Sequence, residues 1–413
     1  MSSPITRRAF GAIAFAFSAQ APRLTAASKA AATNLDDLLR KGIERRKIPA
    51  VAAMVATADK ITYQGAFGKR DVTSPSARAT TDSIFAIASM TKAITSTAAL
   101  QLVDQGKLKL DEPVSKHIPE FANLEVLEGF DNGGKPNLRP VRTPVTLKHL
   151  LTHTSGFCYD TWSGEMVEYE KHGGNAPVGV APLVPLMFEP GKRWQYGYSL
   201  DWTGRLVETV SGLTLEQYFQ RNICEPLGMK DTSFILPAEK FDRLVSRHQR
   251  QADGSLQQEP RTPPAPPAAF NGGGGLYSTP GDYVRFMQMI LRRGRGPGKQ
   301  QILQPATVDM MSTNQIGELG AGRLKSFQPE RSSDVDLHPG ATDKWGLGFL
   351  INTTPYPGGR SAGSLAWAGI ANTFYWIDPK RGICATIMMQ FLPFVDKEAV
   401  GLLGDFERAV YAG

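Results

Sequence analysis

The sequence predicts an α/β (α+β) protein with one sheet lobe and one mostly helical lobe. Short apolar segments typical of strands lie near both ends of the chain, at 50–69 and 345–390. Between them, from about residue 111 to 263, the pattern changes to helices and loops. A chain of 413 residues, 41% hydrophobic and 21% charged, is long enough for one large core or two lobes.

The amino terminus, residues 1–27, is predicted to be an export signal. Arg7 and Arg8 precede an apolar stretch of about a dozen residues and the triplet Ala19-Gln20-Ala21, which is the pattern of a twin-arginine signal. We therefore expect a periplasmic or secreted protein, or a cytoplasmic one if this stretch is only an alanine-rich leader. The stretch is short for a membrane anchor, and no later segment has the apolar length of a transmembrane helix.

The first part of the sheet lobe, residues 34–110, is predicted to fold as helix, hairpin and helix. Apolar residues at helical spacing mark an amphipathic helix over 35–43. The segments "AVAAMVATA" and "ITYQGAFGK" read as two strands joined by a turn at Asp59. A helix then runs from Ser89 to Gln105, just before Gly106.

The helical lobe is predicted over residues 111–269, and the sheet lobe resumes over 270–413. The crossing is "QQEPRTPPAPPAAFNGGGG", stiff at first and then permissive in its backbone angles. Four strand-like segments and a final helix follow: "WGLGFLIN", "SAGSLAWAG", "NTFYWID", "ICATIMMQ" and "DKEAVGLLGDFERAVYAG". Ligand sites favour the seam between two lobes. The polar loop 317–344 is a candidate flap at its rim, or a mobile insertion.

Charge and motif content argue against nucleic-acid, metal and cofactor sites. The formal net charge is +7, but the three arginines of residues 1–27 account for three of these charges, and most other basic residues alternate with acids. The six histidines do not cluster, there is no H-E-x-x-H, and "GFDNGGKP" has Pro136 where a phosphate loop needs a hydroxyl. The scattered cysteines read as small apolar filler: Cys158, Cys224 and Cys384.

The segment "FAIASMTKAITS" holds the strongest candidate for catalysis. On a helix, Ser89 and Lys92 lie on one face, so the amine can reach the hydroxyl. A serine hydroxyl is a poor nucleophile unless a neighbouring base takes its proton, and burial among apolar side chains favours a neutral amine. The alternative is an ordinary helix-capping serine with a lysine that reaches outward to water.

A second marked serine, Ser361, stands in the G-x-S-x-G string 359–363. A nucleophile elbow needs a strand before this string and a helix after it. Here a Pro-Gly-Gly turn precedes Ser361 and a strand-like segment follows, so Ser89 is the preferred nucleophile.

Beyond the S-x-x-K string, the stretch from Phe85 to Phe121 resembles the nucleophile helix of the serine β-lactamase and penicillin-binding protein superfamily. "LKHLLTHTSGF" and "GGGGLYSTPGDYVRFM" are similar to further segments of that superfamily. The resemblance covers most of residues 34–411 and is closest to the family VIII carboxylesterases, which resemble class C β-lactamases, and to the lovastatin-type acyltransferases. It implies a β-lactamase/transpeptidase-like fold with an antiparallel sheet flanked by helices.

The resemblance also implies a tyrosine that acts with the lysine as general base. Two candidates stand in "PGKRWQYGYSLDW". The family string Y-S-L selects Tyr198, whereas the family spacing, five residues after Gly191 and eight before Gly204, selects Tyr196. We favour Tyr196 as the catalytic tyrosine and expect Tyr198 to line the substrate pocket.

A third motif of the superfamily, K-T-G on a strand beside the nucleophile, corresponds here to Trp367-Ala368-Gly369. Family VIII esterases usually carry W-G-G at this place. By resemblance, these three residues contact the substrate, and the amides of Ser89 and Ile370 form the oxyanion hole. Because Trp367 carries no positive charge to attract the carboxylate of a β-lactam, neutral apolar esters are the expected substrates.

The predicted function is therefore hydrolysis of small apolar or short-chain esters through an acyl-enzyme on Ser89, with no cofactor and a small-molecule ester as the only expected partner. Three alternatives remain open: acyl transfer to an alcohol, β-lactamase or D,D-peptidase activity, and a penicillin-binding sensor that is acylated once. The sequence does not indicate the physiological ester or the oligomeric state.

Overall fold

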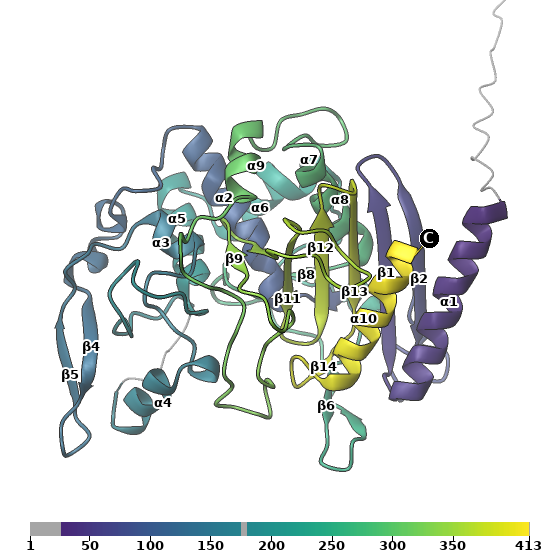
Figure 1. Ribbon diagram of the computed structural model, residues 1–413, viewed down its shortest axis with the longest axis horizontal. Coiled ribbons are helices and arrows are strands. Elements are labelled where there is room, and N and C mark those ends of the chain that lie inside the picture. The colour runs from purple at the N-terminus through teal and green to yellow at the C-terminus, as the bar shows by residue number, and fades with distance from the viewer. Residues whose placement is uncertain (1–25, 175–179, 413) are drawn as a thin grey trace, which may run out of the picture.

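The structure is a computed structural model that describes residues 26–174 and 180–412. Its centre is a seven-stranded antiparallel sheet in the order β2-β1-β13-β12-β11-β10-β9, with strands from both ends of the chain (Figure 1). The strands are β1 (Ala50–Thr57), β2 (Ile61–Gly68), β9 (Lys344–Trp345), β10 (Leu350–Ile351), β11 (Leu365–Gly369), β12 (Thr373–Asp378) and β13 (Ile383–Met388). The predicted fold class is confirmed.

Helices cover both faces of this sheet (Figure 1). Successive side chains of a strand point to opposite faces. Accordingly Tyr375 of β12 packs on Tyr283 of α8, with 4.9 Å between ring centroids, whereas the next residue, Trp376, packs on Phe406 of α10 at 6.0 Å. The amino-terminal helix α1 lies beside α10. The three covering helices are α1 (Ala26–Arg46), α8 (Pro280–Leu291) and α10 (Lys397–Ala412).

The helix α2 (Thr91–Asp104) lies between the sheet and the helical lobe and is buried through most of its length. Most of its side chains are small or apolar, which suits such a central position, and its buried polar residues include Lys92. The remaining helices of the structure are α3 (Leu147–Leu151), α4 (Gly164–Lys171), α5 (Ser199–Ser211), α6 (Leu215–Phe219), α7 (Glu225–Leu227) and α9 (Pro305–Met311).

Short strands and single helical turns complete the fold. The strands are β3 (Phe85–Ala86), β4 (Glu125–Phe130), β5 (Pro136–Pro140), β6 (His248–Arg250), β7 (Leu256–Gln258), β8 (Tyr277–Ser278) and β14 (Phe391–Leu392). The 3-10 turns are η1 (Ala88–Met90), η2 (Val114–Lys116), η3 (Pro119–Asn123), η4 (Asp160–Trp162) and η6 (Ala238–Arg243), and η5 (Gln220–Cys224) is a π-helical turn.

Some elements differ from the sequence prediction. The helix predicted from Ser89 begins at Thr91, because Ser89 lies in the 3-10 turn η1. The segment "WGLGFLIN" is two short strands, since the amide of Gly346 bonds the carbonyl of Phe349 and closes a turn between them. The range 111–269 is not purely helical. It contains the β4–β5 hairpin, and β6 pairs with β14 of the sheet lobe.

Two predictions concern the ends and the membrane. The predicted export signal falls almost entirely on residues 1–25, outside the described part of the chain. Within 26–174 and 180–412, no helix combines the length and the apolar character that crossing a bilayer requires.

Candidate active site

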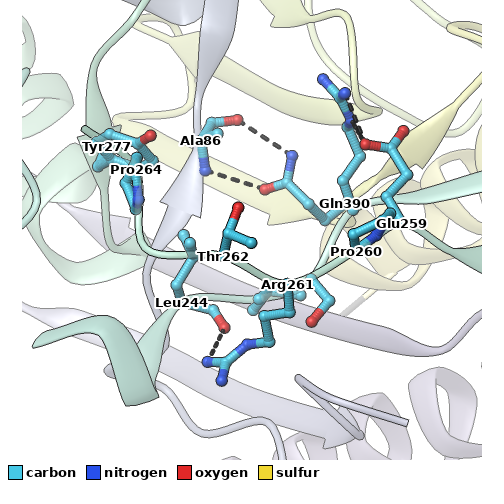
Figure 2. A pocket seen from close by; sticks show the side chains of 12 residues that line it. Ala86, Leu244, Glu259, Pro260, Arg261, Thr262, Pro264, Tyr277 and Gln390 are labelled. Atoms are coloured by element: carbon cyan, nitrogen blue, oxygen red, sulfur yellow. Dashed lines mark hydrogen bonds and ion pairs between the residues drawn. The ribbon is translucent and has the colours of Figure 1, made fainter. Parts of the chain in front are cut away.

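The strand that leads to Ser89 is held on both edges (Figure 2). β3 pairs with β8 through Phe85 and Ala86, and the amide of Ile87 donates to the carbonyl of Leu276 at 2.9 Å. On the other edge, the side-chain amide of Gln390 bonds both backbone groups of Ala86, at 3.0 Å and 3.3 Å. This double clamp fixes the chain three residues before the serine.

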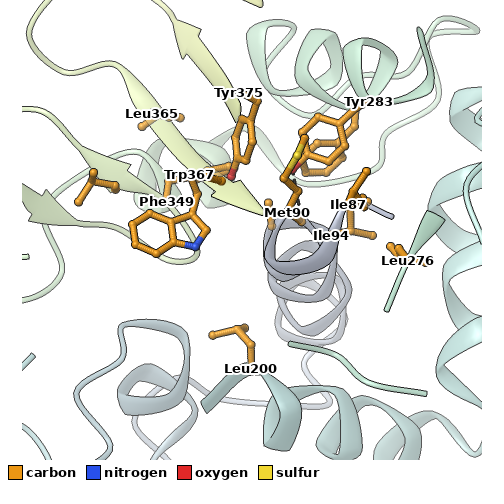
Figure 3. Packing of buried hydrophobic residues seen from close by; sticks show 14 of the residues in the cluster. Ile87, Met90, Ile94, Leu200, Leu276, Tyr283, Phe349, Leu365, Trp367 and Tyr375 are labelled. Carbon is orange, nitrogen blue, oxygen red and sulfur yellow. Dashed lines mark hydrogen bonds between the residues drawn. The ribbon is translucent and has the colours of Figure 1, made fainter. Parts of the chain in front are cut away.

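The chain turns sharply immediately before the nucleophile. Ala88 has a φ of +43°, a left-handed value that costs energy for any residue other than glycine and that recurs at functional sites. Ser89 follows in η1 and is only partly buried, so its hydroxyl is accessible. The turn rests on a dense apolar layer that includes Met90 and Ile94 and the ring of Tyr283 (Figure 3).

The end of β11 lies directly against this turn. A Cβ atom on Gly369 would stand 2.4 Å from the carbonyl oxygen of Ile87, a separation that real Cβ atoms essentially never show. Residue 369 therefore has to be glycine for the strand to approach so closely. The approach brings the Trp367-Ala368-Gly369 motif and the following Ile370 to the nucleophile.

Lys92 is buried, with 1% of its surface exposed, and its amine points at the serine. Nζ donates to Ser89 Oγ at 3.2 Å, to the hydroxyl of Tyr159 at 3.2 Å and to the carbonyl of Gly273 at 2.6 Å. The amine also lies 4.7 Å from the ring centroid of Tyr196. The predicted Ser89–Lys92 contact is present, and the reading of Lys92 as an outward-reaching surface lysine is wrong.

Two residues of this network, Tyr159 and Asp201, were missed from the sequence. Tyr159 donates its proton to Asp201 Oδ2 at 3.0 Å while its oxygen accepts from Lys92. Burial raises the pKa of Asp201, with the charge of Lys92 opposing that effect. Burial, together with the Asp201 carboxylate, also holds the pKa of Tyr159 well above its ordinary value. An acid between Leu200 and Trp202 in an apolar helix pattern was the available signal.

The glycine run 272–275 lets the backbone approach this network. A Cβ on Gly273 would stand 2.1 Å from Asp201 Oδ2, so any side chain there would displace the carboxylate. The neighbouring carbonyl of Gly272 accepts from Thr95 Oγ1 at 2.6 Å. The run predicted as a permissive crossing therefore forms one wall of the site.

Tyr196 and Tyr198 occupy different positions. Tyr196 is 1% exposed, and its oxygen accepts a hydrogen bond from Trp367 Nε1 at 3.0 Å. Its ring also packs on His153, a buried histidine whose pKa burial lowers. Tyr198 is half-buried and packs edge-on against Tyr159, with 4.4 Å between centroids. Among the described residues, the phenol in hydrogen-bond contact with Lys92 is Tyr159, while Tyr196 meets the amine with its ring face.

Ser361 lies away from this group. Its amide donates to Asp378 Oδ2 at 2.8 Å, at the end of the β11–β12 pair opposite to Gly369. The three cysteines are buried thiols without disulfides. Within the described ranges, no three potential metal-ligating side chains gather into a metal site.

The fold and the contact of Ser89 with the buried Lys92 define a serine hydrolase or acyltransferase of the β-lactamase fold. The Beta-lactamase family model matches residues 35–405, and the chain belongs to that family.

The comparisons include both transferases and an esterase. The chain is 33% identical to the Monacolin J acid methylbutanoyltransferase of Aspergillus terreus, over 92% of this chain and 95% of the relative. It is 30% identical to a Lovastatin esterase of Penicillium rubens, over 91% and 98%. A solved mutant of Simvastatin Synthase from Aspergillus terreus superposes with a TM-score of 0.80 at 32% identity, covering 94% of this chain and 96% of that one.

Proposed function

We propose that this chain hydrolyses small, apolar carboxylic esters through an acyl-enzyme on Ser89. The observation that carries the proposal is the buried amine of Lys92, 3.2 Å from Ser89 Oγ, beside a serine that remains accessible. In the first step the proton of Ser89 passes to Lys92, the serine oxygen bonds to the ester carbonyl carbon, and the alcohol leaves with a proton. Water then attacks the acyl-enzyme, and the carboxylic acid departs as Ser89 regains its proton.

In this mechanism Tyr196 acts with Lys92 in proton transfer. The indole N–H of Trp367 donates to the hydroxyl oxygen of Tyr196, so the hydroxyl proton of Tyr196 points elsewhere. Among the described residues, no acceptor for that proton is found. That proton suits the oxygen of the leaving alcohol. Tyr159 and Asp201 orient the amine.

The oxyanion is assigned to the amides of Ser89 and Ile370. Close approach of Gly369 to the nucleophile turn supports this assignment, since Ile370 is the next residue. Backbone donors fixed by β3 and β11 need no reorganisation when charge develops on the carbonyl oxygen.

The surroundings of the serine favour an uncharged substrate. Trp367 packs on Tyr196 and on Trp345, with 4.8 Å between the two indole rings, and offers no cation to a substrate carboxylate. Tyr198, Ala368 and Gly369 complete the assigned substrate contacts and are also uncharged. These features favour apolar esters over penicillins and D-Ala-D-Ala peptides.

A second candidate function is acyl transfer to an alcohol. It is favoured by the names of the relatives, which include a methylbutanoyltransferase that is 33% identical over 92% of this chain. Both functions pass through the acyl-enzyme on Ser89. They differ in whether water or an alcohol then accepts the acyl group.

The test combines covalent labelling with kinetics. A fluorophosphonate is expected to modify the wild type and Ser361→Ala at Ser89, located by peptide mass spectrometry, and to leave Ser89→Ala unmodified. Steady-state turnover of p-nitrophenyl butyrate should follow the same pattern. Labelling at another residue would contradict the proposal, and a single stoichiometric burst without turnover would indicate the sensor alternative.

A further inference from the structure

Residues 327–333, inside the long polar loop, contact all three residues of η4 (Asp160–Trp162), the turn that follows Tyr159. The amide of Phe327 donates to the carbonyl of Thr161 at 2.9 Å. Gln328 Nε2 donates to Asp160 Oδ2 at 2.7 Å, and Gln328 Oε1 accepts from Thr161 Oγ1 at 3.2 Å. The loop is therefore docked on the helical lobe beside the site.

The same residues are bonded to the sheet lobe. The amide of Phe394 donates to the carbonyl of Arg331 at 2.9 Å, and the amide of Ser333 donates to the carbonyl of Phe394 at 2.9 Å. Gln249 of β6, the strand that pairs with β14 of the sheet lobe, donates through Nε2 to the carbonyl of Glu330 at 3.0 Å. Residues 327–333 thus join the two lobes across the candidate active site.

The most buried of these contacts is between Trp162 and Ser332. Trp162 Nε1 donates to Ser332 Oγ at 3.1 Å, and the exposed fractions of the two residues are 7% and 0%. The hydroxyl of Ser332 in turn donates to the carbonyl of Ser333 at 2.7 Å, so its position is fixed. A buried indole N–H without an acceptor is costly, so Ser332 determines the orientation of the Trp162 ring.

The ring of Trp162 packs on two tyrosines of the candidate site, Tyr159 and Tyr196. It meets Tyr196 edge-on with 5.4 Å between centroids and Tyr159 edge-on at 6.1 Å. These contacts connect residues 327–333 to Tyr159, whose hydroxyl bonds Lys92, and to Tyr196, whose ring packs beside the amine. A small displacement of either phenol would misplace the proton-transfer groups.

We propose that residues 327–333 are a positioning element for catalysis, in which Ser332 and Gln328 hold Tyr159 and Trp162 in register with Lys92 without touching substrate. This inference rests on the proposed function, since it assigns these residues to the same Ser89 chemistry. It gives the long polar loop a specific role: residues of the sheet lobe set the geometry of the tyrosines that the helical lobe presents to Lys92.

The test exploits two adjacent serines. Ser332→Ala removes the acceptor of the indole and is expected to lower kcat for p-nitrophenyl butyrate by roughly ten- to a hundredfold, with KM changed less than about twofold. Ser333→Ala is the matched control, because the Ser333 side chain makes no hydrogen bond within the described part of the chain, and it should retain wild-type kcat. Ser332→Thr restores a hydroxyl and should recover most of the activity.

A double-mutant cycle separates positioning from general damage. Trp162→Phe keeps a ring and removes the N–H, so it should lower kcat as Ser332→Ala does, and the double variant should be no worse than either single one. Thermal midpoints identify folded material. If Ser332→Ala does not fold, Gln328→Ala, at a half-buried position, serves as the second variant with the same expected fall in kcat.

Wild-type kcat in folded Ser332→Ala or, in its place, Gln328→Ala would overturn the inference, as would additive losses in the cycle or a loss that Ser332→Thr does not restore. The proposed function is tested separately by fluorophosphonate labelling of Ser89 in the wild type. A wild type without labelling refutes the function, whereas labelling together with unchanged variants refutes only the positioning role.

Discussion

Tyr159 stands between Lys92 and Asp201: its oxygen accepts the amine proton at 3.2 Å, and its own proton goes to Asp201 Oδ2 at 3.0 Å. All three side chains are largely buried, so water cannot readily replace these hydrogen bonds. This arrangement places a carboxylate three hydrogen bonds away from Ser89, through Lys92 and Tyr159, without a direct hydrogen bond to the amine. Such a chain orients the amine in a low-dielectric site.

Removing the hydroxyl of Tyr159, the middle group of this hydrogen-bonded series, should reduce catalysis more than substrate binding. In Tyr159→Phe the amine loses one of three acceptors, and Asp201 loses the hydrogen bond that Tyr159 donates. We expect kcat for p-nitrophenyl butyrate to fall by roughly ten- to a hundredfold, with a small change in KM. Full wild-type kcat in Tyr159→Phe would mean that Tyr159 has only a packing role.

The two tyrosines of "YGY" should separate in the same assay. Tyr196→Phe removes the hydroxyl bonded to Trp367 and is expected to abolish turnover almost completely. Tyr198→Phe, which keeps a ring at the half-buried position beside Tyr159, should change kcat/KM only modestly. A dead Tyr198→Phe with an active Tyr196→Phe would reverse the assignment.

Asp201 should limit stability at neutral pH. Its carboxyl pKa is raised from the ordinary value of 3.8, so the folded state binds this proton more tightly than the unfolded state does. The stabilisation from the protonated form is complete below the unfolded pKa and is lost as pH rises through the folded pKa. Asp201→Asn should therefore have a higher thermal midpoint than the wild type at pH 8 and lower activity, and its advantage should disappear near pH 3.

The control for this measurement is Asp253→Asn, which alters an exposed carboxylate whose pKa is lowered by hydrogen bonds from Ser255. Its thermal midpoint at pH 8 should not exceed that of the wild type in the way expected for Asp201→Asn. A thermal midpoint for Asp201→Asn that stays below the wild type across this pH range would show that the charged Asp201 is a net stabiliser through Lys92.

The sequence was informative where chemistry depends on neighbours along the chain. A spacing of three residues was enough to predict that Lys92 reaches Ser89, and strand patterns predicted β1, β11, β12 and β13. Tyr159, Asp201 and Gly273 come from three distant segments, and only the packed lobes bring them to one amine. The 3-10 turn at Ser89 also escaped prediction, because the left-handed Ala88 carries no glycine signal.

The approach of β11 to the nucleophile gives a further prediction. A methyl group in Gly369→Ala would collide with the backbone carbonyl of Ile87, which cannot move without disturbing β3. We expect a loss of kcat of about a hundredfold or more, with folding measured by circular dichroism and thermal midpoint. Gly281→Ala is the control, since the nearest atom to the added Cβ lies at 3.8 Å. Near wild-type turnover in Gly369→Ala would contradict the assigned oxyanion hole.

The choice between water and an alcohol as the second acceptor can be measured directly. Both reactions pass through the acyl-enzyme on Ser89, so p-nitrophenol release reports acylation, while the ratio of butyrate to butyryl ester reports the acceptor. If the chain is mainly a hydrolase, an added apolar primary alcohol should leave free acid as the main product at acceptor concentrations in the millimolar range. If ester product dominates there, the chain is a transferase, as several of its relatives are named.

The same product ratio can be measured in Trp367→Phe. This variant keeps an aromatic ring but loses the N–H that fixes Tyr196. A misplaced Tyr196 should slow proton transfer with either acceptor. An altered total rate with an unchanged product ratio would therefore place Trp367 in proton transfer, and a changed ratio would place it in acceptor selection.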